Sequence, residues 1–281
     1  MEYHKDRFDD QSLLVYKDTG LVAIFPANSK NQIMYSHQGL TYGGFIFEND
    51  ADTTLIKEVY SLVIDYLKSN HIKTLVIKPL PVMYNVTGIA NIWEHQKNCI
   101  SIKQHIVLAL DYKSNYKIHK TKLKRFRKLE NSNFKIKSGK QEFEPFWNTV
   151  LIQRLKDKHE ASPVHSLNEI QQLKSVFENE IQQYNIYLGS EILAGITIFD
   201  KGLVVKSQYA MATAQGERLY ALDMLFVHLI YKFRDDKRHY FSMGTVNNHS
   251  SIGFSKGMMK QKQELGCTTY LQDIYKLTLN D

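Results

Sequence analysis

Three ionisable side chains stand in stretches where acid–base chemistry is plausible: His37, His165 and Asp223. His165 lies in the turn-prone stretch "SPVHS", just before an expected helix in which Ser166 and Glu169 have capping-box spacing. His37 lies in the uncharged stretch "YSHQGLTYGG", and Asp223 interrupts the apolar run "YALDMLFVHL". A loop histidine can titrate near neutrality, and an aspartate that points into a cleft can orient an amine or act as a base, so we predict that all three are catalytic. The alternatives are histidines that brace their loops and an aspartate that complements a helix dipole.

Basic side chains are concentrated in one segment of the chain. Residues 113 to 140 hold eleven Lys or Arg against one acid, so this segment carries +10 and the rest of the chain sums to −3. Apolar and basic residues alternate at helical spacing there, which predicts a basic helix over residues 113–131. Within it, Lys122 and Arg125 are predicted to contact an anionic substrate, and a solvated helix face is the alternative. No base-reading motif accompanies the charge, so sequence-specific DNA binding is not expected.

Length and composition indicate a globular protein. With 281 residues and 43% hydrophobic residues, the chain can form one large or two ordinary domains. The charged N-terminus lacks the apolar run of a signal peptide, and no stretch approaches the ~18 apolar residues of a transmembrane segment. We therefore expect a cytoplasmic protein. The two cysteines, Cys99 and Cys267, are too few for a disulfide framework, and no metal site is expected.

The same order of elements occurs twice along the chain. In the front half, "LLVYKDTGLVAIFP" predicts two strands, "QIMYSHQGLTYGGF" a third, "LIKEVYSLVIDYLKSN" a helix and "KTLVIKPLP" a closing strand. In the back half, "YNIYLGSEILAGITIF", "LVVKSQYAMATAQG", "LDMLFVHLIYKF" and "RHYFSMGTV" repeat that order. We therefore predict a mixed α/β protein of two similar domains, residues 1–110 and residues 111–281, with coincidence of a common pattern as the alternative.

This order is that of the GNAT acyltransferase fold, and two such units in one chain resemble the Fem-type branch of that superfamily. The stretch "SHQGLTYGGFIF" looks like a Fem-like segment of the first domain. The stretches "SPVHSLNEI", "KSQYAMAT", "LDMLFVHLI", "YFSMGTVNN" and "MKQKQELG" look like second-domain motifs in the same order. The resemblance covers about residues 10 to 276. It implies two tandem GNAT-like units and a transferase of the cell envelope or of polysaccharide synthesis.

The resemblance also implies where ligands bind. Tyr42, Gln208, Tyr209 and Lys262 become candidate substrate contacts, with a solvated lysine as the alternative for Lys262. In the stretch "QGERLYA", Gly216 and Arg218 become candidate cofactor contacts, because GNAT enzymes hold the coenzyme A pyrophosphate in a glycine-containing loop before a helix. The spacing departs from that of the GNAT loop. The alternative is a turn in which Gly216 supplies a positive φ.

The expected activity is therefore that of an N-acyltransferase. It would move an acyl or aminoacyl group onto an amine of a cell-envelope or polysaccharide precursor by direct attack in a shared cleft. The donor is acyl-CoA, such as acetyl-CoA, or aminoacyl-tRNA, and the acceptor is a small molecule or a lipid- or nucleotide-linked precursor. The alternative is a non-catalytic binding protein for an anionic nucleotide-linked ligand or tRNA on a degenerate transferase scaffold.

Overall fold

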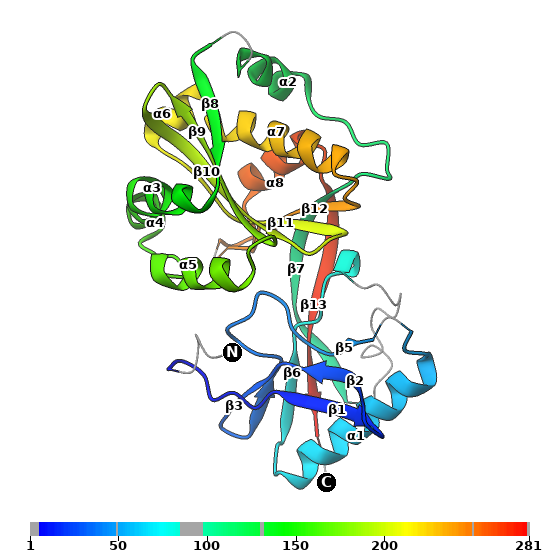
Figure 1. Ribbon diagram of the computed structural model, residues 1–281. Coiled ribbons are helices and arrows are strands. Elements are labelled where there is room, and N and C mark those ends of the chain that lie inside the picture. Colours follow the sequence, from blue (N-terminus) through cyan, green and yellow to red (C-terminus); the bar gives the residue numbers. More distant parts are fainter. Residues whose placement is uncertain (1–5, 49, 85–97, 130–131, 249, 280–281) are drawn as a thin grey trace. The chain divides into compact units, whose positions relative to one another are not determined.

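The chain folds into two compact units. The computed structural model describes residues 6–48, 50–84, 98–129, 132–248 and 250–279 (Figure 1). The first unit comprises Met1–Ile106 and Tyr270–Asp281, and the second comprises Val107–Thr269. The boundary expected at residue 110 lies close to this division. However, the sequence-based division places residues 270–281 in the second domain, whereas the C-terminal strand pairs with a strand of the first unit.

In the first unit, a helix connects two strands that pair in parallel. The unit contains β1 (Leu13–Lys17), β2 (Gly20–Phe25), β3 (Asn28–Lys30), β4 (Ile33–Tyr35), β5 (Ile46–Phe47), α1 (Thr53–Ser69), β6 (Thr74–Ile77) and η2 (Val82–Tyr84). Strands β1, β2 and β5 form a small antiparallel sheet, while β4 pairs in parallel with β6. Helix α1 begins at Thr53 because Asp52 accepts a hydrogen bond from the Leu55 amide at 2.8 Å. Its apolar face is buried in the same core as Leu75 and Ile77 of β6.

Two long strands each have residues in both units: β7 (Cys99–Asp111) and β13 (Thr268–Thr278). Strand β13 pairs antiparallel with β6 over four residues of the first unit. Tyr275 and Leu277 of β13 are buried in the core of that unit. The C-terminal segment therefore completes the sheet and the core of the first unit.

The second unit is built on a sheet with the strand order β7-β12-β11-β10-β9-β8. Its strands are β8 (Phe134–Ser138), β9 (Ile181–Leu188), β10 (Glu191–Asp200), β11 (Val204–Ala212) and β12 (Tyr240–Thr245). Its helices are α2 (Lys120–Phe126), η4 (Arg127–Leu129), η5 (Lys140–Glu142), α3 (Phe143–Pro145), η6 (Phe146–Leu151), α4 (Ile152–His159), α5 (Leu167–Val176), α6 (Ala214–Leu219), α7 (Ala221–Asp235) and α8 (Lys256–Glu264). Helix α7, almost wholly apolar in its middle, packs against β9, β10 and β11.

The predicted order of strands and helices is confirmed in both halves. The pattern β4–α1–β6 of the first unit corresponds to β11–α7–β12 of the second, and each pair of flanking strands is parallel. The halves differ in their hairpins. In the first unit, β1 and β2 belong to a separate three-stranded sheet, whereas β9 and β10 join β11 in one antiparallel array. The mixed α/β class with tandem GNAT-like units is therefore correct.

The basic helix expected over residues 113–131 is wrong in its extent. Helix α2 begins at Lys120, because His119 has extended backbone dihedral angles and its ring accepts a hydrogen bond from the Thr121 amide. The α-helix ends at Phe126, and a 3₁₀ turn, η4, follows it from Arg127 to Leu129. Asn131, expected to end the helix, lies outside the described residues.

No helix in the part of the chain that the structure describes combines the length and the hydropathy that crossing a membrane requires.

Candidate functional site

Strands β11 and β12 separate partway along the second unit. They pair in parallel only over residues 204–206 and 240–242, although β11 continues to Ala212 and β12 to Thr245. A β-bulge lies at the same point: in the register between β10 and β11, Tyr209 pairs with Thr197 and Gln208 is passed over. A bulged residue leaves the hydrogen-bonded ladder and redirects its backbone and side chain. Beyond residue 206, β11 therefore no longer pairs with β12.

Tyr209 and His165 form a hydrogen-bonded pair beside this opening. The His165 backbone amide donates to the Tyr209 hydroxyl at 3.1 Å, and the hydroxyl lies 2.7 Å from Nδ1 of the same histidine. Which of these two groups donates to the other depends on the tautomer of the His165 ring, because a hydroxyl oxygen can accept two hydrogen bonds. Trp147 donates to the His165 carbonyl at 3.1 Å and packs edge-on against Tyr209. Two predicted site residues are thus in contact, and both side chains are held in place.

The loop that carries His165 is held by a helix cap. Ser166 and Glu169 form the predicted capping box at the start of α5, with amide-to-side-chain distances of 3.2 and 2.7 Å. His165 itself is buried, with 6% of its surface exposed.

Lys262 of α8 contacts the end of β12 that is no longer paired with β11. Its ammonium donates to the carbonyl of Met243 at 2.6 Å and to that of Thr245 at 3.1 Å. Burial lowers the pKa of Lys262 to about 8. The residue therefore satisfies backbone acceptors at the separated strand and holds an amine that titrates near physiological pH.

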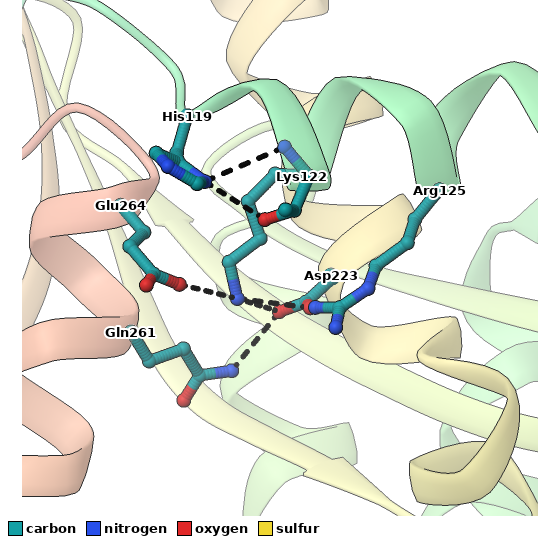
Figure 2. A network of polar contacts seen from close by, with 7 residues as sticks. His119, Lys122, Arg125, Asp223, Gln261 and Glu264 are labelled. Carbon is teal, nitrogen blue, oxygen red and sulfur yellow. Dashed lines mark hydrogen bonds and ion pairs between the residues drawn. The ribbon is translucent and has the colours of Figure 1, made fainter.

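Asp223 lies in a buried network of charges rather than facing an open cavity (Figure 2). Both of its carboxylate oxygens accept hydrogen bonds from the Lys122 ammonium at 2.9 Å. One oxygen also accepts from Arg125 at 2.6 Å, and Gln261 donates to the other at 3.3 Å. Glu264 completes the network at 3.4 Å from the Lys122 ammonium. Three predicted residues are therefore brought together, and with Glu264 the network holds two positive and two negative charges.

This network joins three helices that are far apart in the sequence. Lys122 and Arg125 come from α2, Asp223 from α7, and the two remaining members from α8. The backbone amide of His119, just before α2, donates to the Glu264 carbonyl at 2.8 Å. Charge pairs of this kind hold the inner face of α2 against α7 and α8.

The stretch between β11 and α7 differs from its predicted form. In place of a loop, residues 214–219 form the short helix α6, whose Thr213 cap accepts the Gly216 amide at 3.0 Å. The interpretation that Gly216 supplies a positive φ is wrong: that residue is helical, and Tyr220 has φ 59°. Gly216 is instead required by close packing, because a Cβ there would lie 2.0 Å from the Leu193 carbonyl oxygen. Arg218 is exposed.

His37 and Tyr42 belong to the first unit, whereas the other predicted residues belong to the second. His37 is buried and has φ 52°, and its Nδ1 accepts a hydrogen bond from the Gly39 amide at 3.2 Å. Burial lowers the pKa of its ring, against the opposing effect of Asp10. The Tyr42 ring packs on that of Tyr84.

Sequence reasoning missed two kinds of site residue. Gln261 and Glu264 were not singled out, although two polar residues three apart on a helix share a face. The carbonyls of Met243 and Thr245 carry no side-chain signal, so only the structure places them. Among the described residues, no group of three His, Cys, Asp or Glu side chains could hold a metal ion.

Two units with parallel strands flanking a helix, and separated, bulged strands in the second, define the class: this is the tandem GNAT fold. No family model matches the chain, and neither does any curated protein sequence. Among solved structures, the chain is similar to FemX, with a TM-score of 0.71 at 9% identity over 99% of this chain and 90% of FemX.

Two further solved structures carry the same fold. One is the C-terminal domain of a putative lysylphosphatidylglycerol synthetase from Agrobacterium fabrum, with a TM-score of 0.62 at 7% identity over 96% of this chain and 84% of the other. The second is a tandem GNAT protein from the clavulanic acid biosynthesis pathway, with a TM-score of 0.50 at 8% identity over 96% and 83%. At these identities the likeness establishes the fold.

Proposed function

We propose that this protein is an acyltransferase that moves an acyl or aminoacyl group onto an amine of a cell-envelope or polysaccharide precursor. One observation carries the proposal: the bulge at Gln208 coincides with the point where β11 separates from β12. In this proposal an extended acyl donor lies along the edge of β11 beyond residue 206, where the pairing with β12 has ended. The bulge frees backbone groups that can bind the acyl carbonyl.

In the reaction, the acceptor's amine nitrogen attacks the donor's carbonyl carbon and forms the new C–N bond. The C–S bond of a thioester, or the C–O bond of an aminoacyl ester, then breaks and the leaving group departs. The Gln208 amide is our candidate donor to the developing oxyanion. The His165–Tyr209 pair is our candidate acceptor of the amine proton, because His165 is held by two hydrogen bonds to the Tyr209 hydroxyl.

Lys262 has a separate role in this proposal. Its ammonium holds two carbonyls of β12 and places a positive charge on the strand opposite Gln208. A cation there would attract a phosphate or carboxylate of the acceptor. Asp223 is neutralised by two cations, so we propose that it positions α2 rather than accepting a proton.

The resemblance suggests two candidate classes of acyl donor. GNAT-type proteins imply acyl-CoA, and the Fem-type resemblance implies aminoacyl-tRNA. The Gly216 amide, which a GNAT phosphate loop would aim at the pyrophosphate, is bonded to Thr213. This favours aminoacyl-tRNA over acetyl-CoA.

The test is a donor panel with purified full-length protein. Acetyl-CoA, longer acyl-CoA and a mixture of aminoacyl-tRNAs are each incubated with amino-sugar, peptide and lipid-linked amine acceptors. Thiol release and transfer of radiolabel are measured. We expect turnover with one donor class and a loss of at least tenfold in Tyr209→Phe, which keeps the ring and removes the hydroxyl. The matched control is Tyr66→Phe, on an exposed face of α1.

A non-catalytic binding protein is the second candidate, favoured by the same engagement of the Gly216 amide. It predicts saturable binding of tRNA or nucleotide-linked ligands with no turnover by any donor. Unchanged binding in Tyr209→Phe, together with an inactive wild type, would replace the transferase proposal with this one.

A further inference from the structure

The outer side of the basic helix borders a hollow of about 450 Å³ in the second unit. It is lined by Lys124, Arg127, Lys128, Ser132, Phe134, Leu219 and Met224. These residues come from α2 and the turn after it, from the start of β8, and from the α6–α7 junction. The hollow therefore lies outside the separation of β11 and β12 and does not include the residues proposed for transfer.

The rim of the hollow carries three positive charges. Lys124, Arg127 and Lys128 are exposed, and no carboxylate is among the described lining residues. The opposite face of the same helix carries Lys122 and Arg125, whose two charges are balanced by those of Asp223 and Glu264. The basic segment is thus divided into an inner face that fixes the helix and an outer face whose charge is directed to solvent.

A rigid support makes this rim different from a mobile lysine-rich surface. The Arg125 guanidinium lies 3.5 Å from the ring centre of Tyr220, the left-handed residue that joins α6 to α7. Tyr220 stands next to Leu219, which forms part of the hollow's wall. The helix that carries the rim and the wall of the hollow are therefore joined by a direct contact beside the hollow.

The opposite wall is apolar and small. Phe134 is half-buried, Leu219 is partly buried and Met224 is fully buried. One aromatic ring and two aliphatic side chains can cover a planar base, but they cannot line a lipid acyl chain. Arg and Lys side chains are suited to phosphate, because they form charge-assisted hydrogen bonds with its oxygens.

We propose that this hollow binds a nucleoside phosphate, with its phosphates on Lys124, Arg127 and Lys128 and its base against Phe134. The ligand is either a free nucleotide or the terminal nucleotide of an RNA strand, because both present the same chemistry. Binding here is argued from the hollow alone and does not depend on the transfer reaction.

The experiment is calorimetric titration of the full chain with three probes: ADP, inorganic phosphate, and a short single-stranded RNA with a fluorescent label. We expect saturable ADP binding that Arg127→Gln with Lys128→Gln weakens about tenfold or more, as loss of charge-assisted contacts implies. Lys120→Gln is the control, because it removes one positive charge from an exposed position of the same helix that does not line the hollow. It should change ADP affinity less than about twofold. Thermal melting of each variant verifies that it is folded.

The base and the source of the nucleotide are tested separately. Phe134→Leu should weaken ADP binding and leave phosphate binding unchanged. Stronger binding of RNA that the same double substitution abolishes identifies a strand end as the ligand, and weaker binding of RNA than of ADP identifies a free nucleotide. Three results would overturn the proposal: no ADP binding, equal losses in Lys120→Gln and the double variant, or equal affinity for ADP and phosphate. Binding of anionic vesicles in place of ADP would also overturn it.

Discussion

Removal of the Asp223 charge should strongly destabilise the second unit. In Asp223→Asn, the Lys122 ammonium would stay buried, since its side chain is only 5% exposed, with Glu264 at 3.4 Å as its remaining carboxylate partner. A cation left in the interior after loss of its partner costs about 3–5 kcal/mol. Because Glu264 still offsets part of this cost, we expect a loss of about 3 kcal/mol in the free energy of unfolding.

The assay is urea unfolding followed by tryptophan fluorescence. The chain has two tryptophans, so a Trp93→Phe background leaves Trp147 as the only tryptophan. Trp147 is fully buried in the second unit and therefore reports the unit that contains the network. Lys122→Met and the Lys122→Met/Asp223→Asn double variant complete a thermodynamic cycle.

The cycle separates a charge pair from two independent contributions. We expect a coupling free energy of at least about 1.5 kcal/mol between Lys122 and Asp223, since the double variant leaves no unpaired lysine in the interior. A coupling below about 0.5 kcal/mol would refute the view that this pair fixes α2 on α7. A loss below about 1 kcal/mol in Asp223→Asn alone would refute the burial argument.

Three further results follow from single contacts. Gly216→Ala should lower the free energy of unfolding by about 1–3 kcal/mol, because its Cβ would meet the Leu193 carbonyl; an unchanged melting temperature would contradict this. As the pH rises from 8 to 10.5, the free energy of unfolding of the wild type should increase by up to about 3 kcal/mol relative to that of Lys262→Met, because Lys262 stays protonated only in the unfolded state over this range. Urea unfolding measured across this pH range would disprove this if the two proteins showed parallel profiles. Ser166→Ala should cost about 1 kcal/mol in urea unfolding and Ser166→Asp much less, and equal losses would show that the cap at Glu169 contributes nothing.

Local signals made the elements predictable from the sequence. The apolar spacing in "LIKEVYSLVIDYLKSN" and "LDMLFVHLIYKF" corresponds to α1 and α7, and the Ser166–Glu169 spacing corresponds to the cap of α5. Where the prediction failed, the cause was a competing local interaction. The basic helix begins late because the His119 ring caps it, and periodicity alone does not distinguish a capping residue from a helical one.

The site could be predicted in its residue types but not in its pairings. Lys122, Arg125 and Asp223 were all singled out, yet their mutual contact joins positions about a hundred residues apart. A single acid in an apolar helix indicates that it has a charged or polar partner, but the sequence does not show which residue that partner is. The bulge at Gln208 depends on the register between β10 and β11, and the residue type at position 208 does not predict it.

The return of β13 to the first unit has a consequence for the order in which the chain acquires its structure. Residues 107–269 form a continuous segment that holds every strand and helix of the second unit's interior. The first unit, although most of it is synthesised earlier, lacks the strand carrying Tyr275 and Leu277 until that strand too has left the ribosome, after residues 107–269. Domains generally fold as units during synthesis, with the N-terminal one first. In this chain the order of completion is reversed, because the first unit remains without part of its core until the whole second unit has been synthesised.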